Sequence, residues 1–472
     1  MTTANESFVI GLDLGTSGLR VIAVAPSGDV IASSTRPIAA LTFSHGVHEQ
    51  DPAQWWQAIV DAAREIANKT LPAKSLALAV TSTSGSLVAV DSRGIPVRPA
   101  ILYDDVRAAS AAQILNQEFG GSGWSASNSL PKALFIRDQE RETWSRVAHL
   151  LHPADWIAGK LTGCFGVSDT SNALKLGYNA ESGTWDPVIA RVHLDPYLLP
   201  RVHSVGSSTG TITAGTARET LLPHGMPVLP AGTDGLSSLV ASGAVKPGDA
   251  NTTLGTTLVW KVLAQTKPHS AALYSHLHPS GLWAPGAASS AGPGALEQLS
   301  FDEMEALNHA AARYFPTKVL SYPLRGRGER FPFRSSDARG FVEGMSASAD
   351  EARAAVLQGL AFVERWGYER MEAEGVVVGP RVFSTGGAAR SEILSRLRAE
   401  VSGRAVIRSK NAHAAFGAAI VAASNAYFDG SVATAIAAMC KTDQVFEPES
   451  AGRFDNAYRD FLACCTKRGF VP

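Results

Sequence analysis

The chain has 472 residues, of which 45% are hydrophobic and 18% are charged, and its formal net charge is −1. This length predicts roughly two to four domains, and the composition is that of an ordinary globular protein. Because there is no basic excess, we expect no nucleic-acid partner and no anionic membrane surface. Gly, Ser or charged residues interrupt every apolar stretch before about 18 residues, so we expect no transmembrane helix.

Residues 1–7 are polar and lack the order of charged and apolar segments that defines a signal peptide. The four cysteines form no Cys-x-x-Cys pair, although Cys464 and Cys465 are adjacent. These features predict a reduced, cytoplasmic protein without disulfides or a structural metal site. The histidine pairs at 45/48 and 276/278 are predicted to be ordinary loop or strand residues, because no carboxylate–histidine cluster accompanies them.

The first predicted element is a hairpin. Two β-type runs, over 8–14 and 19–25, flank the tight turn Gly15-Thr16-Ser17. A third strand is predicted over 30–34, after Ser27-Gly28. A helix then follows Asp51-Pro52, since Asp51 can cap it and proline suits its first position.

The remainder of the first half alternates buried-type strands with helices. Trp55-Trp56 predicts core packing rather than a platform for a ligand. The further predicted elements are a strand over 76–80 that leads into the polar turn 81–86, a continuation of that sheet over 87–90, a helix over 105–116, mostly helical structure to about 172, a strand over 228–232 and a small-residue helix over 236–244.

The second half repeats these landmarks in the same order. Leu254-Gly255-Thr256-Thr257 joins two β-type runs over 251–264, as Leu14-Gly15-Thr16-Ser17 does in the first half. A long amphipathic helix over 351–370, a strand over 382–384 that enters a Gly-rich turn, and a small-residue helix over 411–422 follow. The order indicates a duplication. Turn chemistry at 246–249 then predicts two domains, 1–245 and 246–472.

Tight Gly-Thr turns offer backbone N–H groups and hydroxyls that bind anions, phosphate above all. One copy alone is explained as well by a plain hairpin turn. Two copies, one in each half, favour a pair of related domains that close on a polyphosphate.

A set of short motifs gives the chain a resemblance to the FGGY carbohydrate kinases, within the wider superfamily of actin-like, Hsp70-like and sugar-kinase ATPases. They occur in family order over nearly the whole chain: Gly11-Leu12-Asp13-Leu14-Gly15-Thr16-Ser17, His48-Glu49-Gln50-Asp51-Pro52 with Trp55-Trp56, Asp155-Trp156 with Leu161-Thr162-Gly163, Ala231-Gly232-Thr233-Asp234, Leu254-Gly255-Thr256-Thr257, Gly328-Glu329-Arg330-Phe331-Pro332, Gly386-Gly387-Ala388 and Ala415-Phe416-Gly417-Ala418-Ala419.

Within that family, four stretches are most similar to the D-ribulose kinases of cyanobacteria and plants: 83–85, 171–178, 274–276 and 326–332. Typical xylulokinases carry a Gly-Gln-Met-His-Gly sugar-binding turn, whereas this chain has Thr83-Ser84-Gly85-Ser86 there. The resemblance therefore implies D-ribulose as the substrate and D-ribulose 5-phosphate as the product. Xylulose, or another ketose or polyol, is the alternative.

The resemblance implies an α/β fold of two duplicated RNase H-like domains, with the sugar and phosphates on the N-terminal domain, the nucleotide mainly on the C-terminal one and an interdomain cleft. The activity implied is ATP-dependent phosphorylation of a sugar, with ATP and Mg²⁺ as cofactors. The implied partners are small molecules, and the sequence leaves a homodimer open. A sugar-independent ATPase of the actin or Hsp70 kind is the rival, which the Asp-Pro-x-x-Trp-Trp and Gly-Glu-Arg-Phe-Pro motifs disfavour.

The carboxylates have separate implied roles. Asp234, which ends a predicted strand, is the candidate catalytic base and would accept the proton of the sugar hydroxyl. Its alternative role is that of a helix cap. Asp13 is assigned to the Mg²⁺ environment through water, close to the substrate. The candidate sugar ligands are Thr83 and Ser84, together with Asp105 and Arg107, which resemble the family's aromatic-x-Asp-x-Arg loop. A surface salt bridge at a helix start is the alternative for this last pair.

The candidate nucleotide ligands share small side chains that let the backbone approach phosphate or a flat base. They are Thr16, Ser17, Gly255, Thr256, Thr257, Gly292, Gly386, Gly387, Ala388 and Ser391.

Overall fold

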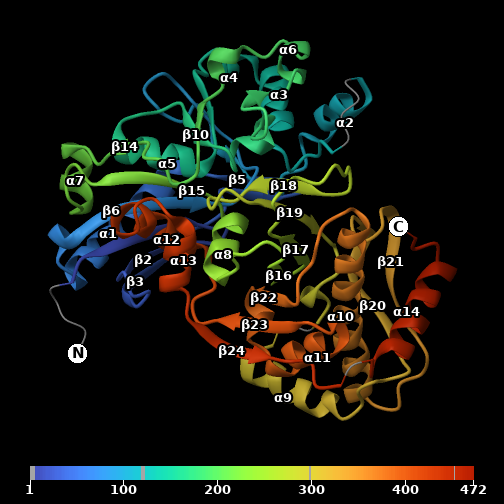
Figure 1. Cartoon of the computed structure of the whole chain (residues 1–472). Coiled ribbons are helices and arrows are strands. Elements are labelled where there is room, and N and C mark those ends of the chain that lie inside the picture. The colour runs from blue at the N-terminus through green and yellow to red at the C-terminus, as the bar shows by residue number, and fades with distance from the viewer. Residues whose placement is uncertain (1–5, 119–122, 297–298, 451, 472) are drawn as a thin grey trace. The chain divides into compact units, whose positions relative to one another are not determined.

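The computed structural model describes residues 6–118, 123–296, 299–450 and 452–471 and separates into two compact units. Figure 1 colours the chain by residue number. The first unit holds 1–241, 276–281 and 413–439, and the second holds 242–275, 282–412 and 440–472. Residues 1–5, which contribute to the predicted absence of a signal peptide, lie outside the described residues. Within the described ranges no helix has both the length and the apolar character needed to cross a membrane.

The first unit is built on a six-stranded sheet in the order β14-β15-β6-β1-β2-β3. Strand β1 pairs antiparallel with β2 and parallel with β6, and β6 pairs parallel with β15. The bounds of these strands are β1 (Phe8–Leu14), β2 (Gly18–Val24), β3 (Val30–Pro37), β6 (Ser75–Ser82), β14 (Gly210–Thr211) and β15 (Pro227–Thr233). The predicted first hairpin and its third strand are thus confirmed.

The second unit is built on a seven-stranded sheet in the order β18-β19-β17-β16-β22-β23-β24. Here β16 pairs antiparallel with β17 and parallel with β22, and β22 pairs parallel with β23. The strands are β16 (Ala250–Leu254), β17 (Leu258–Val262), β18 (Tyr274–Leu277), β19 (Trp283–Ala288), β22 (Arg381–Thr385), β23 (Ala405–Ser409) and β24 (Thr442–Phe446). Each sheet therefore contains five strands with the same order and the same pattern of parallel and antiparallel pairing. These strands are β3-β2-β1-β6-β15 in the first unit and β19-β17-β16-β22-β23 in the second. This confirms the predicted duplication and the RNase H-like fold.

The two faces of β1 are covered by different helices, because successive side chains of a strand point to opposite faces. The even-numbered side chains from Phe8 to Leu14 share a core with helices α1 (Pro52–Lys69) and α5 (Pro153–Thr162). Asp51 caps α1 by accepting the N–H of Ala53 at 2.9 Å, as predicted. Gly11, on the other face, lies against the backbone of Ala415 in α12 (Ala414–Tyr427), and Figure 1 shows this red helix beside the blue strands.

Helix α12 is closely packed because several of its residues are small. A Cβ atom added to Gly417 would lie 1.8 Å from the carbonyl oxygen of Ser237 in α8 (Asp234–Ser242), and one added to Gly11 would lie 2.0 Å from that of Ala415. Both contacts are with backbone atoms, so no side-chain rotation can relieve them. Small residues thus allow α12 to lie directly on β1 and α8.

We expect Gly417→Ala to destabilise the protein by about 2–4 kcal/mol, because the new methyl group must displace α12 from α8. The matched control is Gly215→Ala in α7 (Ala214–Thr220), where the nearest atom to the new Cβ is the Thr213 hydroxyl at 3.8 Å. That change should be neutral or stabilise by up to about 1 kcal/mol, since alanine is the better helix former. Thermal and urea unfolding measure both; equal stability of the two variants would contradict the packing argument.

In the second unit, the long helix α10 (Ala349–Ala373) packs on the sheet through a buried polar network. Glu364 accepts a hydrogen bond from Thr252 of β16 at 2.5 Å and pairs with Arg398 at 2.5 and 2.7 Å. Arg398 lies in α11 (Glu392–Ser402) and is 1% exposed. This ion pair joins two helices and the central strand of the unit.

Two predicted elements differ from the structure. Residues 87–90 do not continue the main sheet, because β7 (Val88–Val90) pairs with β9 (His149–Leu151) in a separate two-stranded sheet. The helix predicted over 105–116 begins only at α2 (Ala109–Glu118), because hydrogen bonds to the Asp105 carboxylate fix a turn before it.

The remaining described elements are β4 (Thr42–Ser44), β5 (Val47–Gln50), β8 (Ala100–Ile101), α3 (Ser129–Gln139), α4 (Arg141–Trp144), β10 (Val167–Asp169), β11 (Tyr178–Asn179), β12 (Thr184–Trp185), α6 (Val188–Arg191), β13 (Arg201–His203), α9 (Phe301–Ala312), β20 (Leu320–Glu329), β21 (Ser335–Glu343), α13 (Val432–Met439), α14 (Asp455–Lys467) and five short 3-10 turns.

Candidate active site

Two carboxylates meet at the strand ends of the first unit. Asp13 is the penultimate residue of β1 and lies on the same face as Gly11, toward α12. Asp234 is the first residue of α8, directly after β15, and its Oδ1 accepts the N–H of Gly235 at 2.6 Å. Burial and the neighbouring Asp234 carboxylate raise the pKa of Asp13 to about 7, although Arg20 opposes the shift. The fold thus brings two residues together that are separated by 221 positions in the numbering.

The first Gly-Thr turn is a tight hairpin bend, in which Gly15 N–H donates to the Gly18 carbonyl at 2.9 Å. Thr16 is half-buried and Ser17 is exposed. Gln50 donates to the Thr16 carbonyl at 2.7 Å and accepts from the buried Trp55 indole at 2.9 Å. Gln50 therefore fixes the turn from outside. Sequence reasoning recorded it in a motif but assigned it no role.

The polar turn after β6 holds an unpaired hydroxyl. Within the described residues Ser84 Oγ is buried and has no hydrogen-bond partner. Thr83 N–H donates to the Leu14 carbonyl at 3.2 Å, and Thr83 Oγ1 lies 3.3 Å from Ser86 Oγ. Gly85 has φ of +82°, and a Cβ there would lie 2.1 Å from the Ser127 carbonyl oxygen. The turn is therefore held rigidly beside the end of β1, with one buried hydroxyl whose hydrogen-bonding capacity is unused among the described residues.

Asp105 and Arg107 form an internal ion pair. The Asp105 carboxylate, 1% exposed, accepts from Arg107 Nε at 3.0 Å and Nη2 at 2.7 Å and from the His48 N–H at 2.9 Å. Arg107 also donates to Glu49 at 2.6 Å. Its hydrogen bonds and charge lower the pKa of Asp105, whose burial acts in the opposite sense. The pair does form a salt bridge, but the carboxylate is buried rather than on the surface and precedes α2, and contact of this pair with sugar stays a prediction.

Tyr103 is a candidate that sequence reasoning missed. Burial and the adjacent Asp104 raise its pKa, a hydrogen bond with Thr16 opposes the shift, and Asp234 is close enough to contribute. The Tyr103 hydroxyl therefore lies near both the first Gly-Thr turn and Asp234, the candidate base. The signal was available, because Tyr103 is the aromatic residue of the aromatic-x-Asp-x-Arg segment.

The second unit brings three predicted nucleotide segments together at the end of β16. The turn 255–257 closes with Gly255 N–H donating to the Thr257 carbonyl at 3.2 Å. A Cβ on Gly292 would lie 2.5 Å from Thr257 Cα, and one on Gly386, where φ is +90°, would lie 2.5 Å from the Leu254 carbonyl oxygen. Glycine is required at both places by close backbone approach. Gly255 and Thr256 are exposed, and Thr257 is half-buried.

The remaining predicted nucleotide residues differ in their exposure and in whether they are hydrogen-bonded within the protein. Gly387 is exposed, and no atom would meet a Cβ there within 4 Å, whereas Ala388 is partly buried against the core. Ser391 is 1% exposed, caps α11 through the Leu394 N–H at 3.2 Å and accepts from Asn308 at 3.1 Å. Ser391 is thus engaged within the protein, while the Gly386-Gly387 backbone is accessible.

A divalent cation fits the first-unit carboxylates. Asp13 Oδ1 is buried without a hydrogen-bond partner among the described residues, and two neighbouring carboxylates repel one another. No cluster of three or more His, Cys, Asp or Glu with metal-site geometry occurs in the part of the chain that the structure describes. Mg²⁺ suits such a site, since it commonly takes one or two carboxylates and completes its shell with water and substrate phosphate.

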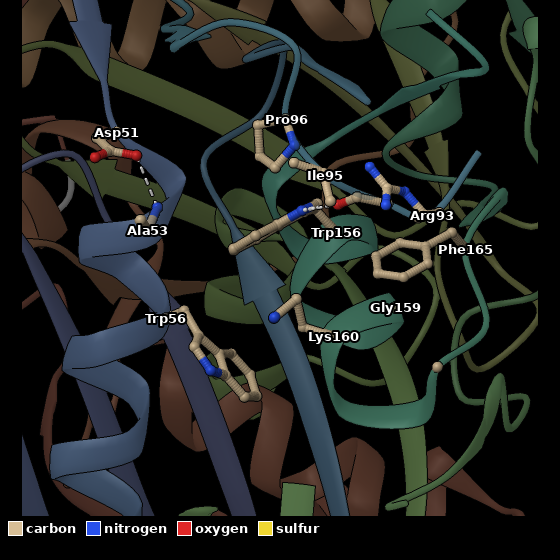
Figure 2. A pocket seen from close by; sticks show the side chains of 12 residues that line it. Asp51, Ala53, Trp56, Arg93, Ile95, Pro96, Trp156, Gly159, Lys160 and Phe165 are labelled. Carbon is tan, nitrogen blue, oxygen red and sulfur yellow. Dashed lines mark hydrogen bonds between the residues drawn. The ribbon is translucent and has the colours of Figure 1, made fainter. Parts of the chain in front are cut away.

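A surface cavity of about 500 Å³ lies in the same unit, and Figure 2 shows its lining. Trp56 and Lys160 face each other across it, with Lys160 Nζ 4.9 Å from the ring centroid. The core packing predicted for both tryptophans is confirmed: Trp55 is buried in the core, and Trp56 packs against that core while half-buried, with its indole N–H donating to Glu219 at 3.0 Å. The cavity contains none of the predicted site residues.

Paired duplicated sheets with Gly-Thr turns and strand-end carboxylates define the actin-like class of ATPases and sugar kinases. Family comparisons agree: residues 8–241 match the N-terminal domain of the FGGY family of carbohydrate kinases, and residues 250–426 match its C-terminal domain. The chain belongs to the FGGY carbohydrate kinases and is an ATP-dependent sugar phosphotransferase.

Relatives of known name cover almost the whole chain. A xylulose kinase of Staphylococcus epidermidis is 28% identical over 94% of this chain and 93% of its own. A xylulose kinase structure from Rhodospirillum rubrum is 27% identical with a TM-score of 0.88, covering 98% of both chains. A glycerol kinase structure from Plasmodium falciparum, solved with ADP, has a TM-score of 0.86 at 16% identity and covers 99% of both chains, which supports the fold alone.

Proposed function

We propose that this FGGY kinase transfers the γ-phosphoryl group of ATP to a pentulose, with Asp234 as the base that accepts the proton of the attacking hydroxyl. The observation that carries the proposal is the pair of strand-end carboxylates, in which Asp234 helps to raise the pKa of Asp13 to about 7. A carboxylate at the start of a helix, next to a second one that suits a cation, provides the acceptor and the electrostatics that phosphoryl transfer needs.

The other residues bind and orient. Thr16 and Ser17 in the first turn, and residues 255–257 in the second, are proposed to donate hydrogen bonds to nucleotide phosphates, and Gly292 and the Gly386-Gly387 backbone to approach the adenosine. Ala388 and Ser391 stay predicted members of this set, although the hydroxyl and the backbone of Ser391 are both hydrogen-bonded within the protein.

The sugar and the cation are proposed to bind in the first unit. The unpaired hydroxyl of Ser84 suits a sugar hydroxyl, with Thr83 beside it. Asp105 and Arg107 are proposed to support this site through their ion pair. Asp13 would hold Mg²⁺ through water, and the bound ion would supply charge neutralisation of the transferring phosphoryl group.

Two pentuloses are candidates, each for a different reason. D-Xylulose is favoured by the names of relatives such as those from S. epidermidis and Escherichia coli, the latter 27% identical over 84% of this chain. D-Ribulose is favoured by Thr83-Ser84-Gly85-Ser86, which replaces the turn of typical xylulokinases. The two sugars differ in the configuration of one hydroxyl, and a site that hydrogen-bonds a hydroxyl discriminates strongly.

A coupled assay with ATP and Mg²⁺ tests the proposal. We expect one of the two pentuloses to accelerate ADP release at least about 100-fold over a reaction without sugar, since the enzyme must favour the sugar hydroxyl over water. The kcat/KM values of the two pentuloses should differ by at least about 10-fold. ATP turnover that ignores every ketose and polyol tested would support the sugar-independent ATPase instead.

A further inference from the structure

A buried hydrogen-bond network surrounds the residues that precede Asp234. Ser171 Oγ lies 3.2 Å from the Thr233 hydroxyl, accepts from the Thr233 N–H at 3.3 Å and lies 3.1 Å from His276 Nδ1. Ser171 is 0% exposed, Thr233 2% and His276 5%. One serine hydroxyl therefore contacts the backbone N–H and the hydroxyl of the residue next to the proposed base.

Ser171 is itself held by a buried carboxylate. Asp169 Oδ1 accepts the N–H groups of Ser171 at 2.8 Å and Asn172 at 2.9 Å, and Oδ2 accepts the Asn172 side chain at 2.7 Å. Asp169 is 0% exposed, and burial together with Asp155 raises its pKa to about 6. Burying this carboxyl group is costly, and its hydrogen bonds fix the backbone of the turn.

The strand that these residues contact carries a β-bulge. Pro230 pairs with Val80 but Thr233 pairs with Ser82, so β15 has one more residue than β6 over this interval. Gly232 in the bulge has φ of +76°, and its carbonyl accepts from the Thr81 hydroxyl at 2.8 Å. A bulge changes the direction of the strand that follows it, and here Asp234 follows at once.

We infer that Ser171 and Thr81 are positioning residues that fix the bulge of β15 from its two sides and thereby set where the Asp234 carboxylate lies. His276 orients Ser171 through its ring nitrogen. The inference rests on the proposed role of Asp234. Both residues act on the backbone at 232–233 rather than on the reacting atoms. Because proton transfer needs a base within hydrogen-bond reach, a displacement of about 1 Å costs roughly 100-fold in rate.

The test compares Ser171→Ala and Thr81→Val with wild type and with two reference variants. Thr81→Ser keeps the hydroxyl. Ser168→Ala removes a serine hydroxyl that is equally buried, three residues before Ser171, but has no hydrogen-bond partner in the described part of the chain. We expect kcat for the pentulose to fall about 10–100-fold in the first two variants. In these two variants the KM values for ATP and for the pentulose should change less than about 3-fold, because ground-state binding is unaffected.

Thr81→Ser should restore most of kcat, and Ser168→Ala should leave it within about 2-fold of wild type. A fall in the observed kcat could come from slower active sites or from a smaller fraction of folded protein. Measuring the number of ATP-binding sites per mole of protein distinguishes the two. Wild-type kcat per ATP site in both Ser171→Ala and Thr81→Val would overturn the positioning role, as would a loss that Ser168→Ala shares. If Asp234→Asn is fully active, the proposed base is wrong; if Asp234→Asn is inactive while these variants are normal, only the positioning inference fails.

Discussion

Replacement of Asp234 by asparagine should lower kcat for the pentulose by about 10³-fold or more, while ATP still binds. The amide preserves the size of the side chain and its hydrogen bond from the Gly235 N–H, but it cannot accept the hydroxyl proton. Asp234→Ala should have the same effect. Steady-state kinetics and ATP binding by calorimetry measure the two halves of the prediction.

The matched control is Asp302→Asn, because Asp302 also lies in the first turn of a helix, α9, but is exposed. This change should leave kcat within about 2-fold of wild type, and any effect of the helix dipole should appear as a few tenths of a kcal/mol in stability. Near-normal turnover in Asp234→Asn would remove Asp234 from the mechanism.

Asp13→Asn should have opposite effects on activity and stability. Activity should fall about 100-fold or more, because the cation would lose the carboxylate proposed to hold it. The ligand-free protein should instead become more stable at neutral pH. The free-energy cost of ionising Asp13 in its buried position beside Asp234, which raises the pKa to about 7, is removed by the neutral amide.

The sign of the pH dependence follows from the direction of that shift. Between about pH 4 and pH 7 the folded protein holds a proton on Asp13 that the unfolded chain has released, so wild-type stability falls as the pH rises through this interval. The gain from Asp13→Asn should be small below pH 4 and reach at most about 4 kcal/mol above pH 7. Urea unfolding without Mg²⁺ or ATP, from pH 4.5 to pH 8, measures it.

Asp138→Asn serves as the control for this series, because Asp138 is half-exposed and paired with Arg137 on the surface. Its effect should stay within about 0.5 kcal/mol at every pH. A stability gain in Asp13→Asn that does not depend on pH would show that the ionised carboxylate carries no penalty.

The features that local pattern encodes were predictable from the sequence. The two hairpins, the capped helix after Asp51 and the strand that ends at Asp234 each follow from turn residues and the period of apolar positions. The motifs in series also led to the FGGY family, which the domain matches confirm.

Features that depend on partners far along the chain could not be predicted in this way. Ser171 contacts Thr233 from 62 residues away, and Glu364 meets Thr252 from 112. No periodicity marks the bulge of β15, since it arises from the register between two strands. The partial exposure of Trp56 at the cavity likewise depends on the loop and helix that line this cavity, and not on its tryptophan neighbour.

The covering of β1 and β6 by α12 has a consequence for how this protein can be divided. A fragment that ends at residue 245 would lack the helix at 414–427, and the face of its central strands around Gly11 would be bare. Such a fragment should aggregate, and supplying a peptide of that helix in trans, or joining it by a linker to the truncated chain, should rescue it. The two halves of the chain are duplicated, but the first folded unit needs a helix from the second half.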